Sequence, residues 1–201
     1  MNVILDYDVG NLDSVIRGFE RAGIETIVSK DPKVIEKATS LILPGVGAFE
    51  DAMKALKASQ LIPLIKQHVA HNKYLFGICL GMQLLYEKSY ENGEFEGLGL
   101  LKGQIEMLDI PLKVPHMGWN NLIFNKPNDL ILSHIEQDDY VYFVHSYYVN
   151  GRQSDVVAYT RYGVDIPAIV HDKNIYATQF HPEKSGRVGQ NILKAYGALI
   201  K

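Results

Sequence analysis

The chain has 201 residues, of which 47% are hydrophobic and 21% charged, with a net charge of −3 and one cysteine. This length fits one domain with its own core, and one cysteine excludes a disulfide scaffold. The charge balance leaves no basic footprint for nucleic acid or an anionic membrane, and no apolar run reaches the roughly 18 residues of a membrane span. Since no signal peptide is recognisable either, we expect a cytoplasmic protein.

In the first half of the chain, short apolar runs alternate with helical patterns. Strands are expected at 3–5, 25–28, 40–43 and 74–78. Helices are expected at 48–57, 61–72, 80–87 and from Leu12 to a stop at Gly23. This alternation favours a parallel sheet that helices cover on both faces.

Between Gly97 and Gln179, strands and turns dominate instead. Strand-like runs are found at 140–149, 156–162, 166–170 and 175–180, and a last helix follows them. We expect these strands to be antiparallel additions to the core sheet. The predicted fold is a single three-layer α/β domain over 1–201, with a mainly parallel central sheet and antiparallel additions.

The single cysteine lies between two glycines at the predicted junction of a strand and a helix. Gly77, Cys79 and Gly81 match the spacing of the nucleophile elbow, in which a sharp turn raises a reactive side chain above the sheet edge. N–H groups at the start of the following helix favour a thiolate and an oxyanion. The alternative is a buried structural cysteine between loop glycines.

A nucleophilic thiol needs a base and a group that orients the base. Of seven histidines, His181 has the most suggestive context, because it ends a predicted strand and precedes Pro182 and Glu183. If the backbone is extended there, both side chains point toward one site, and the carboxylate fixes the imidazole tautomer. His68 and His71 are expected on the solvated face of a helix.

A glycine-rich turn, Pro44 to Gly47, follows the third predicted strand. Glu50 occupies the third position of a dinucleotide fingerprint, where a carboxylate would oppose a pyrophosphate, so that interpretation is rejected. Such a turn can instead present N–H groups to an oxyanion, or be an ordinary turn between strand and helix.

The elbow cysteine, the downstream His-x-Glu and the upstream Pro-Gly-x-Gly turn together resemble the class I glutamine amidotransferases over nearly the whole chain. The resemblance implies a flavodoxin-like three-layer fold and a triad of Cys79, His181 and Glu183 that hydrolyses glutamine through a glutamyl thioester. It also implies an oxyanion and substrate site formed by Gly45, Val46, Gly47, Leu80, Gln83, Ser146 and Tyr147. No metal or cofactor is implied.

Within that family, the segment Pro115–Asn120 is similar to one typical of the glutaminases of imidazole glycerol phosphate synthases, in histidine biosynthesis. This narrower resemblance implies a heterodimer with a (β/α)₈-barrel cyclase that receives ammonia, and a glutaminase silent until that partner binds its nucleotide substrate. The partner interface would include Met117, Trp119, Asn120, Tyr142 and Lys184.

Three alternatives remain open at this point. A glutaminase for pyridoxal phosphate synthesis fits the triad but not the Pro115–Asn120 segment. An intracellular protease or stress protein with the same elbow would have a histidine after the cysteine, where Leu80 stands. A non-catalytic binding subunit would not need Cys79, His181 and Glu183 intact.

Overall fold

A computed structural model describes the whole chain, Met1–Lys201, around one eight-stranded sheet. The strand order is β2-β1-β3-β4-β14-β13-β12-β9. The first five of these strands run parallel: β2 (Thr26–Ser29), β1 (Asn2–Leu5), β3 (Ser40–Leu43), β4 (Tyr74–Ile78) and β14 (Ile175–Thr178). The other three run antiparallel to their neighbours: β13 (Val164–Asp172), β12 (Val156–Tyr162) and β9 (Ile123–Phe124).

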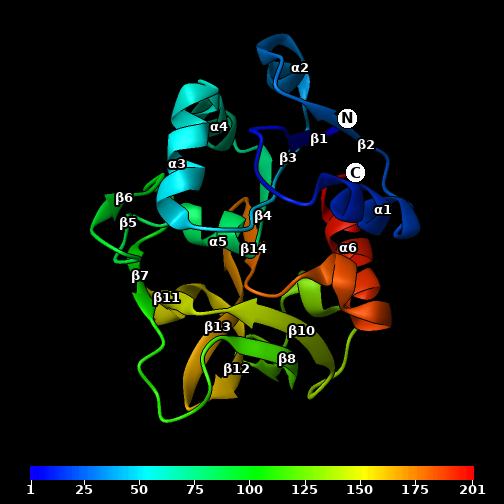
Figure 1. Ribbon diagram of the computed structural model, residues 1–201. Helices are drawn as coiled ribbons and strands as arrows, with labels where there is room; N and C mark the ends of the chain where they lie inside the picture. The colour runs from blue at the N-terminus through cyan, green and yellow to red at the C-terminus, as the bar shows by residue number, and fades with distance from the viewer.

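Helices form the outer two layers, and α3 and α4 lie on the opposite side of the sheet from α1 and α6 (Figure 1). The helices are α1 (Leu12–Arg21), α2 (Pro32–Lys37), α3 (Phe49–Ala58), α4 (Leu61–Ala70), α5 (Leu80–Leu84) and α6 (Gly186–Leu199). Three 3₁₀ turns complete the set: η1 (Leu130–Leu132), η2 (Gln153–Asp155) and η3 (Pro182–Lys184). None of the helices is long and apolar enough to cross a membrane.

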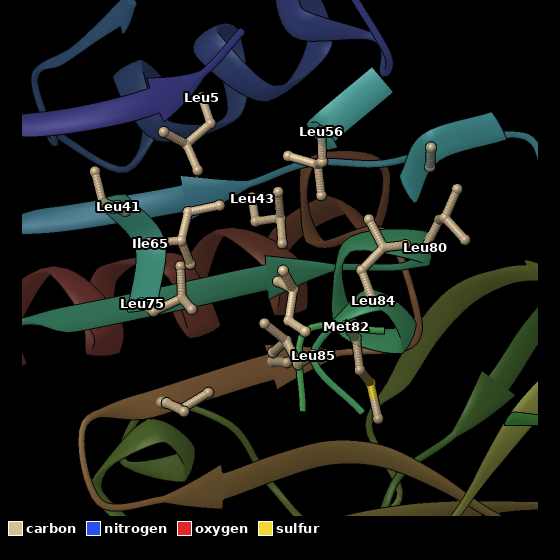
Figure 2. Close-up of a cluster of buried hydrophobic side chains, with 14 of the residues drawn as sticks. Leu5, Leu41, Leu43, Leu56, Ile65, Leu75, Leu80, Met82, Leu84 and Leu85 are labelled. Atoms are coloured by element: carbon tan, nitrogen blue, oxygen red, sulfur yellow. The ribbon is translucent and has the colours of Figure 1, made fainter. Parts of the chain in front are cut away.

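A leucine-rich core fills the space between the sheet and the α3–α4 layer (Figure 2). Leu43 and Leu75 project from the strands and meet Leu56 and Ile65 of the helices, all four fully buried. Burying one such side chain stabilises the fold by about 1.5–3 kcal/mol. The apolar runs that predicted the strands are therefore continuous because both faces of the sheet are covered.

The predicted mainly parallel sheet with antiparallel additions is confirmed, but the place of residues 140–149 was wrong. The predicted strand is interrupted at Ser146, and its two halves belong to two separate small sheets. β10 (Tyr140–His145) pairs with β8 (His116–Asn121), and β11 (Tyr147–Gly151) pairs with β7 (Gly103–Met107). β5 (Lys88–Ser89) and β6 (Phe95–Glu96) complete the sheet that contains β7.

The helix expected over 80–87 is shorter, since α5 ends at Leu84. The carbonyl of Leu84 accepts from the Leu98 amide, and that of Leu85 accepts from the amide of Leu100. These loop amides take the acceptors that another helical turn would need. The unpredicted helix α2 has six residues and buries one of them, Ile35, so it leaves no periodic pattern.

The three loops that carry the predicted site residues meet at one edge of the main sheet. β3, β4 and β14 are adjacent and parallel, so the segments after Leu43, Ile78 and Thr178 leave the same edge. Open α/β sheets bind ligands at this carboxyl edge.

Candidate active site

Cys79 is held in a backbone conformation that few non-glycine residues adopt, with φ 54° and ψ −110°. Its amide donates to the Thr178 carbonyl at 2.8 Å, which ties the turn to β14. A Cβ at Gly81 would lie 1.9 Å from the Leu43 carbonyl oxygen, and one at Gly77 would lie 3.0 Å from the Gly81 carbonyl oxygen. Glycines on both sides are therefore what lets the chain turn this sharply at the thiol.

His181 and Glu183 are paired across a 3₁₀ turn. The distance from His181 Nδ1 to Glu183 Oε1 is 2.8 Å, and both side chains are buried. The backbone is extended at His181, with φ −98° and ψ 98°, and turns at Pro182, the first residue of η3, so the extended condition holds only for His181. The turn still directs the carboxylate onto Nδ1, so Nε2 remains free for proton transfer.

The electrostatics of this pair favour an imidazolium. Burial acts to lower the pKa of His181, but hydrogen bonds to Cys79 and Glu183, and the negative charge of both groups, raise it to about 9. At neutral pH His181 is therefore charged, as an acid that protonates a leaving group requires.

Gln179 is a contact of the thiol that the sequence did not reveal. It is fully buried, and its Nε2 lies 3.9 Å from Cys79 Sγ, within donating distance of sulfur. Its Oε1 accepts from Gln83 Nε2 at 3.0 Å. Gln179, which follows β14, thus links the thiol to Gln83 of α5.

A cavity of about 360 Å³ opens in front of Cys79. Most of the predicted site residues line it: Val46, Gly47, Cys79, Leu80, Gln83, Ser146, Tyr147 and His181. Four further lining residues were not predicted from the sequence: Glu91, Pro115, Val144 and His145. Glu91 is distant from every motif, and only the packing of the β5–β6 loop against α3 brings it here.

The loop from Pro44 to Gly47 is fixed at both ends and exposed in between. At its start the Tyr7 hydroxyl donates to the Pro44 carbonyl. Gly45 does not line the cavity, because it packs so closely that a Cβ would lie 2.8 Å from the Gly81 amide nitrogen. Val46 and Gly47 are exposed, and Gly47 has a φ of +93°, which suits glycine.

At the far end of this loop, Glu91 caps helix α3. Ala48 provides no side-chain cap, and the first helical amide, that of Phe49, donates to Glu91 Oε2 at 2.8 Å. Burial raises the pKa of the Glu91 carboxyl above its ordinary value. The same carboxylate faces the cavity, where it can also pair with a cationic group.

The predicted interface residues lie on or beside the ribbon of β8 and β10. Met117 and Trp119 are 60% and 56% exposed, and Tyr142 stands opposite Trp119 in the register. Lys184 is exposed on η3. Asn120 faces the other way, and its amide donates to His116 Nε2 and to the Arg161 carbonyl.

The ribbon is tied directly to the histidine of the site. His181 N donates to the Tyr142 carbonyl at 3.2 Å, and the Tyr142 amide donates to Ser185 Oγ at 3.0 Å. Ser185 Oγ in turn donates to the His181 carbonyl at 2.7 Å. A shift of β10 would therefore move His181.

His68 makes a structural contact away from the site. His68, expected on a solvated helix face, is buried and its Nε2 bonds to the Tyr74 carbonyl. Burial lowers its pKa to about 4. The expectation was wrong for His68, because α4 turns this position toward the start of β4, and confirmed for His71, which is exposed.

Known proteins are similar to this chain over nearly its whole length. A family model described as glutamine amidotransferase class-I matches residues 3–196. The chain is 48% identical over 199 residues to the imidazole glycerol phosphate synthase subunit HisH of Caldanaerobacter subterraneus subsp. tengcongensis, with 98% of each chain covered. It is 50% identical over 195 residues to the subunit HisH of Lactococcus lactis subsp. lactis, with 96% of each covered.

Solved structures agree in fold. The structure of PurLQS from Thermotoga maritima aligns with a TM-score of 0.77 at 19% identity, covering 100% of this chain and 98% of that one. A crystal structure of a glutamine amidotransferase aligns with a TM-score of 0.73 at 21% identity, covering 97% and 98%.

Proposed function

The chain belongs to the class I glutamine amidotransferase family, and from that premise we propose that it is the glutaminase subunit of an imidazole glycerol phosphate synthase. The observation that carries the proposal is Cys79 on its strained elbow at the mouth of the cavity, with His181 and Glu183 paired behind it. The HisH relatives, near 48% identical over almost the whole length, support the choice of synthase.

The reaction is hydrolysis of the glutamine side-chain amide in two stages. Cys79 Sγ forms a bond to the carboxamide carbon, and the carbonyl π electrons move to oxygen. The imidazolium of His181 protonates the amide nitrogen, the tetrahedral intermediate collapses, and the C–N bond breaks so that the –NH2 group leaves as neutral ammonia. His181, now neutral, takes a proton from water, whose oxygen attacks the thioester; glutamate leaves and the thiolate returns.

Backbone N–H groups stabilise the oxyanion. The Leu80 amide is at the start of α5, beside Cys79, and the Val46–Gly47 segment faces the same cavity. Removing one such donor costs roughly 10²–10³ in rate in acyl-transfer enzymes. Because Val46 and Gly47 are exposed between two fixed ends, this segment is where partner binding would complete the oxyanion site and activate the enzyme.

The cavity recognises glutamine by its charged end as well as its amide. Gln83, Ser146 and Tyr147 form the wall opposite the loop, and Glu91 supplies a carboxylate for the α-ammonium group. A carboxylate paired to an ammonium selects an amino acid over a simple amide.

Ammonia released into water would be protonated and lost as a nucleophile, so the glutaminase must deliver it directly. We place a (β/α)₈-barrel cyclase on the exposed face of β8 and β10, where Met117, Trp119 and Tyr142 provide the apolar and aromatic groups of an interface. Lys184 lies beside them. The barrel combines ammonia with phosphoribulosyl-formimino carboxamide ribotide to form imidazole glycerol phosphate and aminoimidazole carboxamide ribotide.

Covalent trapping tests the glutaminase. The complex with the cyclase is treated with an electrophilic glutamine analogue and digested for mass spectrometry. We expect one adduct, on Cys79, which excess glutamine suppresses and which Cys79→Ala abolishes. A chain that stays unlabelled while the complex turns over glutamine would refute the role of Cys79.

A further inference from the structure

Two buried histidines next to the cavity have no part in the mechanism. His145 lines the cavity at the end of β10, and His116 lies opposite it at the start of β8. They are 6% and 3% exposed. His145 Nε2 lies 3.0 Å from His116 Nδ1, and His145 Nδ1 lies 3.0 Å from the Tyr147 carbonyl oxygen.

The direction of this chain of hydrogen bonds follows from its last acceptor. A carbonyl oxygen only accepts, so His145 donates from Nδ1 and, being neutral, accepts at Nε2. His116 therefore donates from Nδ1 and accepts at Nε2, where the Asn120 amide donates at 3.3 Å. Every donor in the chain meets an acceptor, and only one tautomer of each ring satisfies it.

Packing fixes the two rings in this arrangement. His116 is stacked between Phe143 and Tyr162, with centroid distances of 4.8 and 4.1 Å. Burial lowers the pKa of His116 to about 4. Burial lowers the pKa of His145 to about 3, although the hydrogen bond to the Tyr147 carbonyl acts to raise it, and the positive charge of His181 adds to the lowering. Both rings are thus neutral at physiological pH, as this series of hydrogen bonds requires.

The Tyr147 carbonyl is the point at which this chain meets the substrate site. It also accepts from Gln83 Nε2 at 3.0 Å, so two side chains hold it from two directions. Ser146 lies between β10 and β11, and Tyr147 begins β11 opposite Met107, so the Tyr147 carbonyl stands at the end of the strand ladder, where these two side chains hold it.

We propose that His145 is a positioning residue for glutamine, holding the Ser146–Tyr147 wall through the Tyr147 carbonyl, and that His116 keeps it in the one tautomer able to do so. The inference rests on the proposed glutaminase function, because its effect is read on glutamine. The two histidines hold the Ser146–Tyr147 segment, which lines the cavity, from behind.

Two substitutions of His145 separate hydrogen bonding from packing. His145→Asn places an amide N–H where Nδ1 stood and keeps the bond to Tyr147, but leaves space behind it. His145→Phe fills the space and loses the bond. In the cyclase complex we expect His145→Phe to raise the glutamine KM about tenfold with kcat within about twofold, and His145→Asn to raise KM about threefold or less. If His145 only fills space, His145→Asn should raise KM more than His145→Phe does.

A third substitution tests the tautomer. In His116→Phe, nothing donates to His145 Nε2, so we expect KM to rise about threefold. In His116→Asn, the amide N–H can replace Nδ1 and restore a near wild-type KM. ¹⁵N NMR of histidine-labelled complex should show His145 protonated at Nδ1 only in the wild type and a mixture of tautomers in His116→Phe.

Each outcome decides one claim. A wild-type complex without glutaminase activity would contradict the proposed function. The tautomer of His145 could still be determined by NMR in that case, because this measurement does not depend on activity. An active wild type, with an unchanged KM in His145→Phe or with His145 protonated at Nε2, would overturn the positioning role. Complex formation and thermal unfolding of each variant show that it is folded.

Discussion

At the residue scale, the reactivity proposed for Cys79 rests on a backbone conformation that costs about 1–3 kcal/mol. The Thr178 carbonyl and the close approach of Gly77 and Gly81 hold it there. The side chain reaches the cavity because the chain cannot relax.

Glu183 controls the protonation of its neighbour. Its negative charge and hydrogen bond favour the His181 imidazolium and help raise that pKa to about 9. The protonated fraction falls as pH rises through this value, so the basic limb of kcat/KM should lie near pH 9. In Glu183→Gln we expect this limb at lower pH and kcat about 10²-fold lower.

The prediction is checked by measuring kcat/KM against pH for the cyclase complexes of the wild type and of Glu183→Gln. Glu20→Gln, on the exposed side of α1, is the matched control. A basic limb at the same pH in Glu183→Gln would contradict the role assigned to the carboxylate.

Local pattern was enough to predict that Cys79, His181 and Glu183 lie together, because the elbow and the His-x-Glu spacing are each local motifs at strand ends. It was not enough for Gln179, Glu91 or His145. Gln179 and His145 occupy strand ends, where an ordinary sheet position has the same appearance in sequence. Glu91 reaches the cavity only through tertiary packing.

At the element scale, helix α1 supports the site although it contributes no group to it. Gly18 lets η3 approach so closely that a Cβ there would lie 2.6 Å from Glu183 Cβ. Arg21 Nη2 donates to the Glu183 carbonyl at 3.2 Å. The position of Glu183 therefore depends on how α1 packs.

Gly18→Ala should displace η3. We expect about 1–3 kcal/mol less unfolding free energy from overpacking and a kcat about tenfold lower as Glu183 moves from His181. Urea unfolding and steady-state glutaminase assays measure the two effects. Glu20→Ala, on the exposed side of the same helix, is the control, and a kcat equal to its value would refute the link.

Elements with a clear local pattern were predicted well: the periodic helices α1 and α3 and the continuous apolar strands β3 and β4 lie where their patterns put them. Errors arose where tertiary contacts overrule local preference. Loop amides end α5 early, and the break at Ser146 sends one aromatic run into two sheets. Neither the loop contacts of α5 nor the interruption at Ser146 can be recognised from the neighbouring residues in the sequence.

At the scale of the whole molecule, the carboxyl edge of the sheet and the β8–β10 ribbon enclose the site between them. Tyr142 belongs to the exposed face of the ribbon and also bonds to the backbone of His181 and Ser185. A partner docked on the ribbon, as we propose, would therefore contact a strand that is hydrogen-bonded to the backbone of His181.

Trp119 is the aromatic anchor that we expect at the centre of the interface. Trp119→Ala should weaken cyclase binding about 30-fold, the effect of removing a central aromatic contact of about 2 kcal/mol, without changing the fold. Ile27→Ala, exposed on the distant edge strand β2, is the matched control. Calorimetric titration would contradict the docking site if the two variants bound equally well.

The most direct test of the account uses Cys79→Ala in the cyclase complex, with glutamine or ammonium as the nitrogen source. We predict that glutamine-dependent formation of imidazole glycerol phosphate is lost while ammonium-dependent formation continues at the wild-type rate. Glutamine-dependent synthesis that survives in Cys79→Ala would contradict the account.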